Sequence, residues 1–154
     1  MKSKQGFTLV ELMFVVVVVS ILTAIAVPAY QVFVRKSIES SIQQEIQRVM
    51  RDLEQQKARQ FNYLGYSPAV IYFPTGSTVA NAQYTINVAD GDETAKSLDQ
   101  TSSAPKGRNW VIRAKSSDGR LYSYLIDSKG VKCKNKTANN ISMTACGTGG
   151  EVWK

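Results

Sequence analysis

The sequence predicts an α+β protein in which one long N-terminal α-helix packs on a four-stranded antiparallel sheet, followed by a C-terminal loop bounded by two cysteines. Three observations support this fold class. An uncharged apolar segment occupies residues 12–34, an amphipathic helical pattern follows it, and apolar and polar residues alternate in several short runs of the C-terminal half. With 154 residues, the chain has room for one small globular domain beyond the apolar segment.

The apolar segment is long enough to cross a membrane. As a helix, residues 12–34 would extend about 35 Å at about 1.5 Å per residue, and the apolar core of a bilayer is about 30 Å thick. A cleavable secretory signal is the alternative, but it would have a shorter apolar region and a better-placed Ala-x-Ala site. Pro28 removes one helical hydrogen bond and clashes with the preceding turn, so we expect a kink or local melting there.

The helix is expected to continue through residues 35–61. Apolar residues recur there at intervals of three and four, which places them on one face: Ile38, Ile42, Ile46, Val49 and Leu53. We expect this face to pack on the sheet of the same chain, with a seam against a partner helix as the alternative. Breaker residues then end the helix between Phe61 and Gly65, and residues 62–83 form an irregular connection.

Four strands are predicted after this connection. Alternation indicates strands near residues 84–88, 110–115 and 121–126, and a short fourth strand near Val131 and Cys133. Asp118-Gly119 between the second and third strands is typical of a tight hairpin that needs positive φ, so we expect antiparallel pairing. A further turn is expected over residues 127–130.

Composition argues against an enzyme. The chain has no histidine, which excludes histidine-based general base catalysis, a Ser-His-Asp triad and histidine-ligated metal. No other catalytic constellation is present, so we expect neither a catalytic residue nor a cofactor or bound metal. The formal net charge of +7 is compatible with an anionic partner such as nucleic acid or lipid headgroups.

The two cysteines, Cys133 and Cys146, favour a disulfide. Their spacing is unlike common zinc or redox motifs, which stay as the alternatives. A disulfide implies an oxidising compartment, and closing a loop of this length would stabilise the fold by about 3 kcal/mol on the loop-entropy estimate.

Glu11 needs an explanation, because a carboxylate in an apolar helix raises the free energy of membrane insertion by roughly 2.5–3.5 kcal/mol on insertion scales. No lysine or arginine lies in the same stretch, so its partner must come from another chain or from a new amino terminus. The basic leader of residues 1–6, ending in Gly6, followed by Phe7, a threonine, two aliphatic residues and Glu11, resembles the class III signal of the type IV pilin family.

This resemblance implies a processed subunit. Prepilin peptidase would cut between Gly6 and Phe7 and the new Phe7 would be N-methylated, while Glu11 would pair during assembly with the Phe7 amine of a neighbour. The family fold divides the chain into a leader at 1–6, a transmembrane and filament-core half-helix at 7–34, an amphipathic half-helix at 35–61 and a head at 62–154. The type IV pilin fold also implies a kink at Pro28 and a disulfide-bounded C-terminal loop.

Location and partners follow from the same resemblance. The chain would be a single-pass protein of the bacterial inner membrane, contacting membrane lipid and the inner-membrane assembly platform. It would then join other pilins in a helical filament, an extracellular pilus, with the head on the periplasmic or extracellular side. The protein would support pilus biogenesis, twitching motility, adhesion or DNA uptake.

The kind of pilin is suggested by two further segments. Residues 44–66 and the ending 146–153 are similar to PilE-class minor pilins of gammaproteobacteria. A type II secretion pseudopilin is the nearest alternative, and the acidic run 90–93 could then hold calcium, although a solvated acidic turn is the commoner use of such a run.

A DNA-binding minor pilin for natural transformation is a further alternative. Four lysines surround the cysteine loop and could neutralise phosphates without reading base sequence: Lys129, Lys132, Lys134 and Lys136. A run of charge is more often a solvated face, so direct DNA contact ranks behind the structural role.

Overall fold

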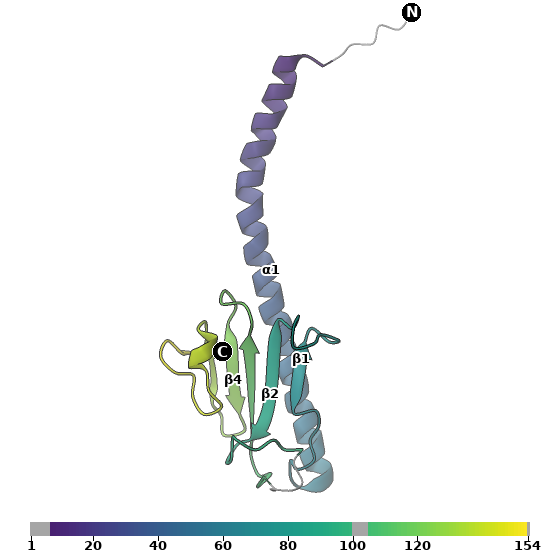
Figure 1. Ribbon diagram of the computed structural model, residues 1–154, viewed down its shortest axis with the longest axis vertical. Coiled ribbons are helices and arrows are strands. Elements are labelled where there is room, and N and C mark those ends of the chain that lie inside the picture. The colour runs from purple at the N-terminus through teal and green to yellow at the C-terminus, as the bar shows by residue number, and fades with distance from the viewer. Residues whose placement is uncertain (1–6, 100–104, 154) are drawn as a thin grey trace, which may run out of the picture. The chain divides into compact units, whose positions relative to one another are not determined.

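The computed structural model describes residues 7–99 and 105–153 of the chain (Figure 1). The leader prediction, including Gly6, lies outside the described residues. The secondary structure elements are α1 (Leu9–Gln60), β1 (Val70–Phe73), β2 (Tyr84–Asp90), β3 (Trp110–Ser116), β4 (Ser123–Asp127), β5 (Lys132–Asn135), the 3-10 turn η1 (Ala138–Asn140) and β6 (Glu151–Val152). The chain divides into two compact units, with the boundary between Ser37 and Ile38.

The N-terminal unit is helical from Leu9 and has no core of its own. Its side chains are exposed along residues 7–33, and the 18-residue window of highest mean hydropathy, 2.7, has none of its residues buried. By length and composition this helix can cross a membrane. Helical structure is continuous through Pro28, so no melted turn interrupts it, and a bend at this residue stays a prediction.

In the second unit, which begins at Ile38 and is called the head unit below, the last turns of α1 present the predicted apolar face to the sheet. The side chains of Ile42, Ile46, Val49 and Leu53 are completely buried there. They join one core with residues of the central strands, among them Tyr84, Ile112 and Ile126. The amphipathic prediction is therefore confirmed, and this helix face packs on the sheet of its own chain.

The sheet has six strands rather than the four predicted. Its order is β1-β2-β3-β4-β5-β6, and every neighbouring pair is antiparallel (Figure 1). The predicted four correspond to β2, β3, β4 and β5, while β1 and β6 add one strand at each edge. Both additions are too short to show an alternating pattern, since β1 has four residues and β6 has two. Pairing with an existing strand, rather than local pattern, makes them strands.

The connection between β3 and β4 corrects one detail of the hairpin prediction. The pairing is antiparallel as expected, but Gly119 does not have positive φ. The connection covers residues 117–122, which is longer than the two-residue loop that requires positive φ. Its turn is closed by the Leu121 N–H, which donates to the Asp118 carbonyl at 3.0 Å.

The outer face of the sheet, away from α1, carries a smaller core. Ala89, Val111 and Leu125 lie on this face and are covered by Ile141 and Cys146 from the C-terminal loop. A disulfide joins Cys133 to Cys146, with a Cα–Cα distance of 6.2 Å, as predicted. The antiparallel sheet, the long helix and this disulfide together match the type IV pilin fold.

Candidate functional site

The first turn of α1 is fixed by a side-chain cap. The Glu11 N–H donates to Thr8 Oγ1 at 3.2 Å, and the Leu12 N–H donates to the Thr8 carbonyl at 3.2 Å. Thr8 is thus the N-cap and Glu11 the third helical residue, the spacing of a capping box. This role of Thr8 was not predicted from the sequence, although the Thr-x-x-Glu pattern could have revealed it. The cap holds Glu11 about one helical turn from Phe7.

Glu11 is exposed and its carboxylate has no hydrogen-bond or ion-pair partner in the part of the chain that the structure describes. The neighbouring Phe7 ring is 85% exposed. A lone carboxylate on an apolar helix is costly in lipid, so it favours a cationic partner supplied from outside this chain.

The hydroxyl groups of Ser20 and Thr23 in the apolar segment are satisfied within the helix. Ser20 Oγ donates to the Val16 carbonyl at 2.7 Å, and Thr23 Oγ1 lies 3.0 Å from the carbonyls of Val19 and Ser20. Such bonds to preceding carbonyls are compatible with a lipid or protein interior. Glu11 is the one charged side chain of residues 7–34, and its carboxylate has no partner among the described residues.

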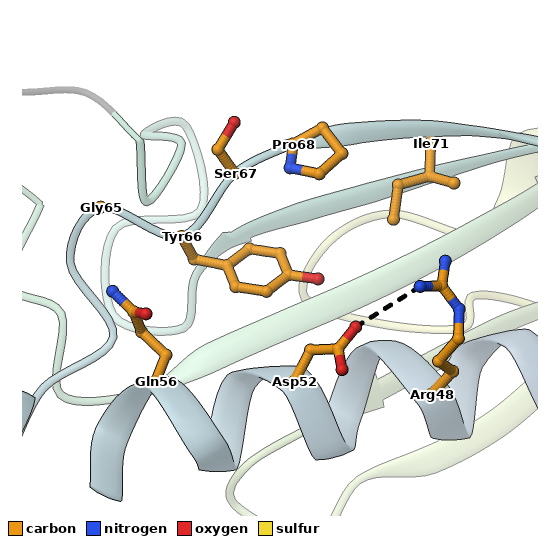
Figure 2. Close-up of a pocket in the computed structure, with 8 residues that line it drawn as sticks. All are labelled: Arg48, Asp52, Gln56, Gly65, Tyr66, Ser67, Pro68 and Ile71. Carbon is orange, nitrogen blue, oxygen red and sulfur yellow. Dashed lines mark ion pairs between the residues drawn. The ribbon is translucent and has the colours of Figure 1, made fainter. Parts of the chain in front are cut away.

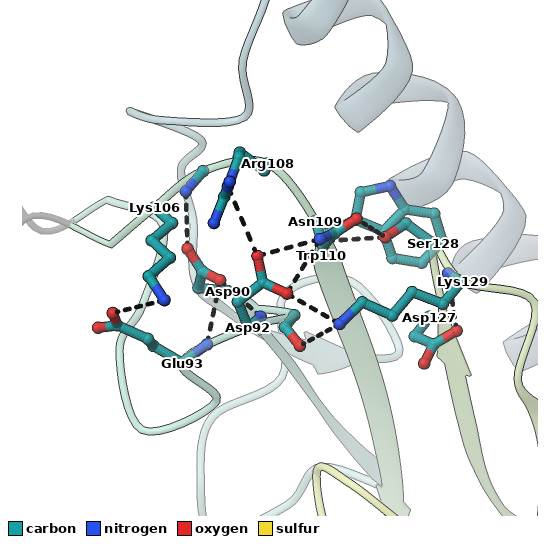
Figure 3. Close-up of polar contacts among 12 residues, drawn as sticks. Asp90, Asp92, Glu93, Lys106, Arg108, Asn109, Trp110, Asp127, Ser128 and Lys129 are labelled. Atoms are coloured by element: carbon teal, nitrogen blue, oxygen red, sulfur yellow. Dashed lines mark hydrogen bonds and ion pairs between the residues drawn. The ribbon is translucent and has the colours of Figure 1, made fainter.

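In the head, the acidic run 90–93 forms a network of protein hydrogen bonds (Figure 3). Asp90 is completely buried. Its Oδ1 accepts the N–H groups of Asp92 and Glu93 at 2.7 and 3.1 Å, and its Oδ2 accepts the Gly107 N–H at 2.7 Å. This carboxylate organises the connection between β2 and β3.

The other two carboxylates of the run, Asp92 and Glu93, also have protein partners. Asp92 accepts Asn109 Nδ2 at 3.0 Å and Lys129 Nζ at 2.8 Å, and the bond from Lys129 is the main cause of the lowered pKa of Asp92 (Figure 3). Glu93 pairs with Lys96 and Lys106. Among the described residues, no group of three or more His, Cys, Asp or Glu side chains is placed to hold a metal ion. These carboxylates therefore connect neighbouring loops through hydrogen bonds and ion pairs.

The structure divides the four lysines considered for DNA contact. Lys129 lies in the turn between β4 and β5 and pairs with Asp92, whereas Lys136 follows β5 at its other end. Lys132 is exposed at the start of β5. The four positive charges therefore extend along β5 instead of gathering at one point.

Two of these lysines share an aromatic ring. Lys134 Nζ lies 4.4 Å from the centroid of the Tyr122 ring, and Lys136 Nζ lies 5.5 Å from it. Lys134 also lies 3.6 Å from Glu151 on β6, which offsets part of its charge. Cation–π contacts of this kind explain the placement of Lys134 and Lys136 without an anionic ligand.

An open pocket of about 410 Å³ lies in the head between α1 and the chain that leads to β1 (Figure 2). Tyr66 is buried beside it, and burial together with the negative charge of Asp52 raises the pKa of its phenol to about 12. Arg48 and Asp52 pair across 3.6 Å on the helix side. The residues that line the pocket are Arg48, Asp52, Gln56, Gly65, Tyr66, Ser67, Pro68 and Ile71. A protonated phenol and a mutually neutralised ion pair form a polar crevice, and this lining holds no activated nucleophile.

Comparison with known proteins identifies the N-terminal segment. Residues 1–27 match the family described as the prokaryotic N-terminal methylation motif. The chain is 46% identical over 46 residues to a type IV major alpha-pilin of Moraxella bovis, a match that covers 30% of this chain and 29% of that protein. It is 46% identical over 55 residues to the type IV major fimbrial protein FimA of Dichelobacter nodosus, covering 35% of each chain.

A third relative is the prepilin peptidase-dependent protein D of Escherichia coli (strain K12). The identity is 51% over 37 residues, covering 24% of this chain and 25% of that protein. These matches therefore span about a third or less of the length of the relatives. No solved structure matches the chain. The chain carries a type IV prepilin motif at its N-terminus, and the proteins that share this segment are type IV pilins and fimbrial proteins.

Proposed function

We propose that this chain is a structural subunit of a type IV pilus, synthesised as a prepilin and assembled through its N-terminal helix. The observation that carries the proposal is the helix start: a threonine cap, an unpartnered Glu11 and an exposed apolar surface beyond it, all inside a prepilin motif. Prepilin peptidase cuts between Gly6 and Phe7, and Phe7 is then N-methylated.

The physical argument concerns what can cover the apolar half of α1. Burying a large aliphatic or aromatic side chain is worth about 1.5–3 kcal/mol, and the exposed side chains of this segment include Phe14, Ile21 and Phe33. Lipid of the inner membrane covers them before assembly, and neighbouring pilin helices cover them in the filament. The Phe7 amine created by processing is a cation that can neutralise Glu11 of a neighbouring subunit.

We propose further that the chain is a minor subunit. Its support is the similarity of residues 44–66 and of the ending 146–153 to minor pilins; the relatives named above are mostly called major proteins, but they share only the N-terminal segment. In this role the chain supports pilus biogenesis, twitching motility, adhesion or DNA uptake, with other pilins, the assembly platform and the peptidase as partners.

N-terminal sequencing and intact-mass analysis of protein from sheared surface filaments test this function. We expect a chain that begins at methylated Phe7, at low abundance relative to a main subunit. Processed protein that stays in the membrane and is absent from sheared filaments would favour a pseudopilin instead. A chain that still begins at Met1 in cells with the peptidase would refute the prepilin assignment.

A further inference from the structure

A small pocket with a cationic lining opens on the outer face of the sheet, the face away from α1. Its volume is about 220 Å³. The lining comes from β1, β2 and β3, from residues 94–97 of the connection after β2, and from Met143 of the C-terminal loop. Among the described residues that line it there is one arginine, one lysine and no aspartate or glutamate. The pocket therefore offers positive charge without an acidic group beside it.

The arginine of this pocket, Arg113, lies in the middle of the sheet. It is opposite Asn87 in the register of β2 and β3 and two residues from Val111, so its side chain shares the outer face. Arg113 Nη2 donates to Asn87 Oδ1 at 3.3 Å. Its Nε atom is buried and has no hydrogen-bond partner in the part of the chain that the structure describes. The guanidinium thus has one neutral acceptor for a group of five N–H donors.

The charge of Arg113 is not neutralised by a carboxylate side chain of its own chain. All twelve Asp and Glu residues lie within the described ranges 7–99 and 105–153, and none of them forms an ion pair with Arg113. The lysine of the pocket, Lys96, pairs with Glu93 outside the lining. An unpaired charge in a partly buried position favours an anion from outside, and the planar fork of a guanidinium matches a carboxylate.

The rest of the lining is neutral and has two kinds of surface. The amide Nδ2 of Asn87 and the hydroxyl of Thr94 have no hydrogen-bond partner among the described residues, so both are available to a ligand hydroxyl. Val70, Ala89 and Met143 supply an apolar surface. The volume is below the range of about 300–1,000 Å³ that is typical of sites for drug-sized ligands, so the pocket suits a ligand with a single ring.

We propose that this pocket binds a sugar acid, a single sugar ring that carries one carboxylate. Arg113 holds the carboxylate, Asn87 and Thr94 bind ring hydroxyls, and Met143 contacts the apolar face of the ring. One unpaired positive charge among neutral groups favours a monoanion with hydroxyls over a nucleic acid strand, whose phosphates need several cations.

The outer face gives the site a use in adhesion, and this use rests on the proposed function. If the α1 helices form the core of a filament, a pocket on the face of the sheet away from α1 is directed to the outside. There it can meet sugar acids as units of an acidic polysaccharide at a cell surface. Binding of the sugar acid itself does not depend on assembly, so it can be measured on the separate chain.

The test is a ligand-observed NMR titration of the full-length chain in a nonionic detergent without a sugar headgroup. The probes are glucuronate, galacturonate and N-acetylneuraminate, with glucose as the neutral ring and with acetate and inorganic phosphate as anions without a ring. We expect at least one sugar acid to bind about tenfold more tightly than glucose and than acetate. Binding of none of the three sugar acids would overturn the proposal.

The decisive variant is Arg113→Gln, which removes the charge and keeps a polar side chain. Its affinity for the sugar acid is expected to fall about tenfold. The matched control is Lys115→Gln, which makes the same charge change on the same strand and face. Lys115 donates to Asn139 Oδ1 at 2.9 Å and does not line the pocket, so this variant should bind as the natural chain does. Equal effects of the two substitutions would show that only net charge matters.

A second variant keeps the test valid if Arg113→Gln folds poorly. Thr94→Val keeps the shape of the side chain and removes its hydroxyl, so the affinity for the sugar acid should fall about threefold to tenfold at an unchanged thermal midpoint. Unchanged affinity in Thr94→Val would contradict recognition of the ring hydroxyls.

The remaining outcomes separate other ligands and the two proposals. Acetate or phosphate that binds as tightly as the sugar acids would reveal a general anion site, and tighter binding of a short peptide through its terminal carboxylate would favour a protein ligand; either result would overturn the sugar acid. Sugar-acid binding by a chain that keeps Met1 in cells with the peptidase would refute the prepilin assignment and retain the site. Normal processing without sugar-acid binding would do the reverse.

Discussion

Glu11 and Asp90 are two carboxylates with opposite surroundings. Asp90 is fully buried in the head and accepts three backbone N–H groups of its own chain. Glu11 is exposed on an apolar helix and has no side-chain partner among the described residues. The first carboxylate serves folding because its hydrogen bonds are complete within the chain. In the proposed function, the Phe7 amine of a neighbouring subunit satisfies the second.

Replacement of Asp90 by Asn tests the buried carboxylate. An amide keeps one acceptor oxygen but sets an NH₂ group against one of the three N–H donors, so at least one buried donor loses its partner. We expect a loss of about 1–3 kcal/mol in the free energy of unfolding, measured by thermal or chemical denaturation of the detergent-solubilised chain. Asp99→Asn, at an exposed position of the same connection, is the control and should change stability by less than about 0.5 kcal/mol. Equal effects of the two variants would contradict the role of Asp90.

At the scale of elements, short polar ties hold the loops to the sheet. Lys129 in the turn between β4 and β5 reaches Asp92 after β2, and Asn109 before β3 binds the same carboxylate. At the other end of the sheet, Asn135 donates to the carbonyls of Cys146 and Thr148, at 2.7 and 2.9 Å. The C-terminal loop is thus fixed by hydrogen bonds as well as by its disulfide.

The tie through Asp92 predicts a dependence of stability on pH. The pKa values of Asp92 and Glu93 are lower in the folded chain than their ordinary values of 3.8 and 4.5, chiefly because Lys129 and Lys96 donate hydrogen bonds to them. A lowered folded-state pKa gives stability that is complete above the ordinary value and is lost as the pH falls through the folded value. We therefore expect the thermal midpoint to fall below about pH 4.5.

Asp92→Asn should flatten this acid dependence while lowering the midpoint slightly near neutral pH, because the charge that responds to pH is removed. The measurement is a series of thermal melts between neutral and strongly acidic pH, with Asp99→Asn as the control that keeps the natural acid dependence. An identical acid dependence in Asp92→Asn and the natural chain would show that the tie contributes nothing to stability. Added salt should weaken the effect, since both groups are at the surface.

At the scale of the whole molecule, the chain combines two compact units that differ in how they treat their apolar side chains. The N-terminal unit exposes its apolar side chains, whereas the head unit buries a core on each face of its sheet. The boundary between Ser37 and Ile38 lies within α1, so one unbroken helix belongs to both units. In the proposed function, the first unit makes the contacts through which subunits assemble, and the second forms the surface of the filament.

Glu11→Val tests the assembly role of the first unit. Removing the carboxylate lowers the cost of membrane insertion, so insertion and cleavage after Gly6 should be retained or improved. Recruitment into sheared filaments, measured by quantitative immunoblotting, should fall about tenfold or more if the pairing with a neighbour's Phe7 amine is worth at least about 1.4 kcal/mol. Leu12→Val is the matched control in the same turn. Recruitment equal to that of the control would refute the pairing.

Much of the fold could be predicted because its elements have strong local patterns. The apolar positions from Ile38 to Leu53 recur at helical spacing over several turns, and all but the partly buried Ile38 are fully buried in the core. β1 and β6 could not be predicted, because four and two residues hold no periodic signal and acquire their conformation from pairing. The positive φ expected at Gly119 was wrong, since the loop length around Asp118-Gly119 depends on where β3 and β4 stop pairing.

The sequence by itself determined the apolar helix, the prepilin motif, the amphipathic face, the four inner strands and the cysteine pair, because each depends on residues close in the chain or on chemistry that only one pairing allows. The tertiary structure alone decided where the charges lie. The four lysines are spread along β5, and the carboxylates of the acidic run accept hydrogen bonds from donors of the same chain. The tertiary structure also set Phe61 in a left-handed conformation beside solvent. These outcomes depend on contacts between distant residues, which pattern and composition do not specify.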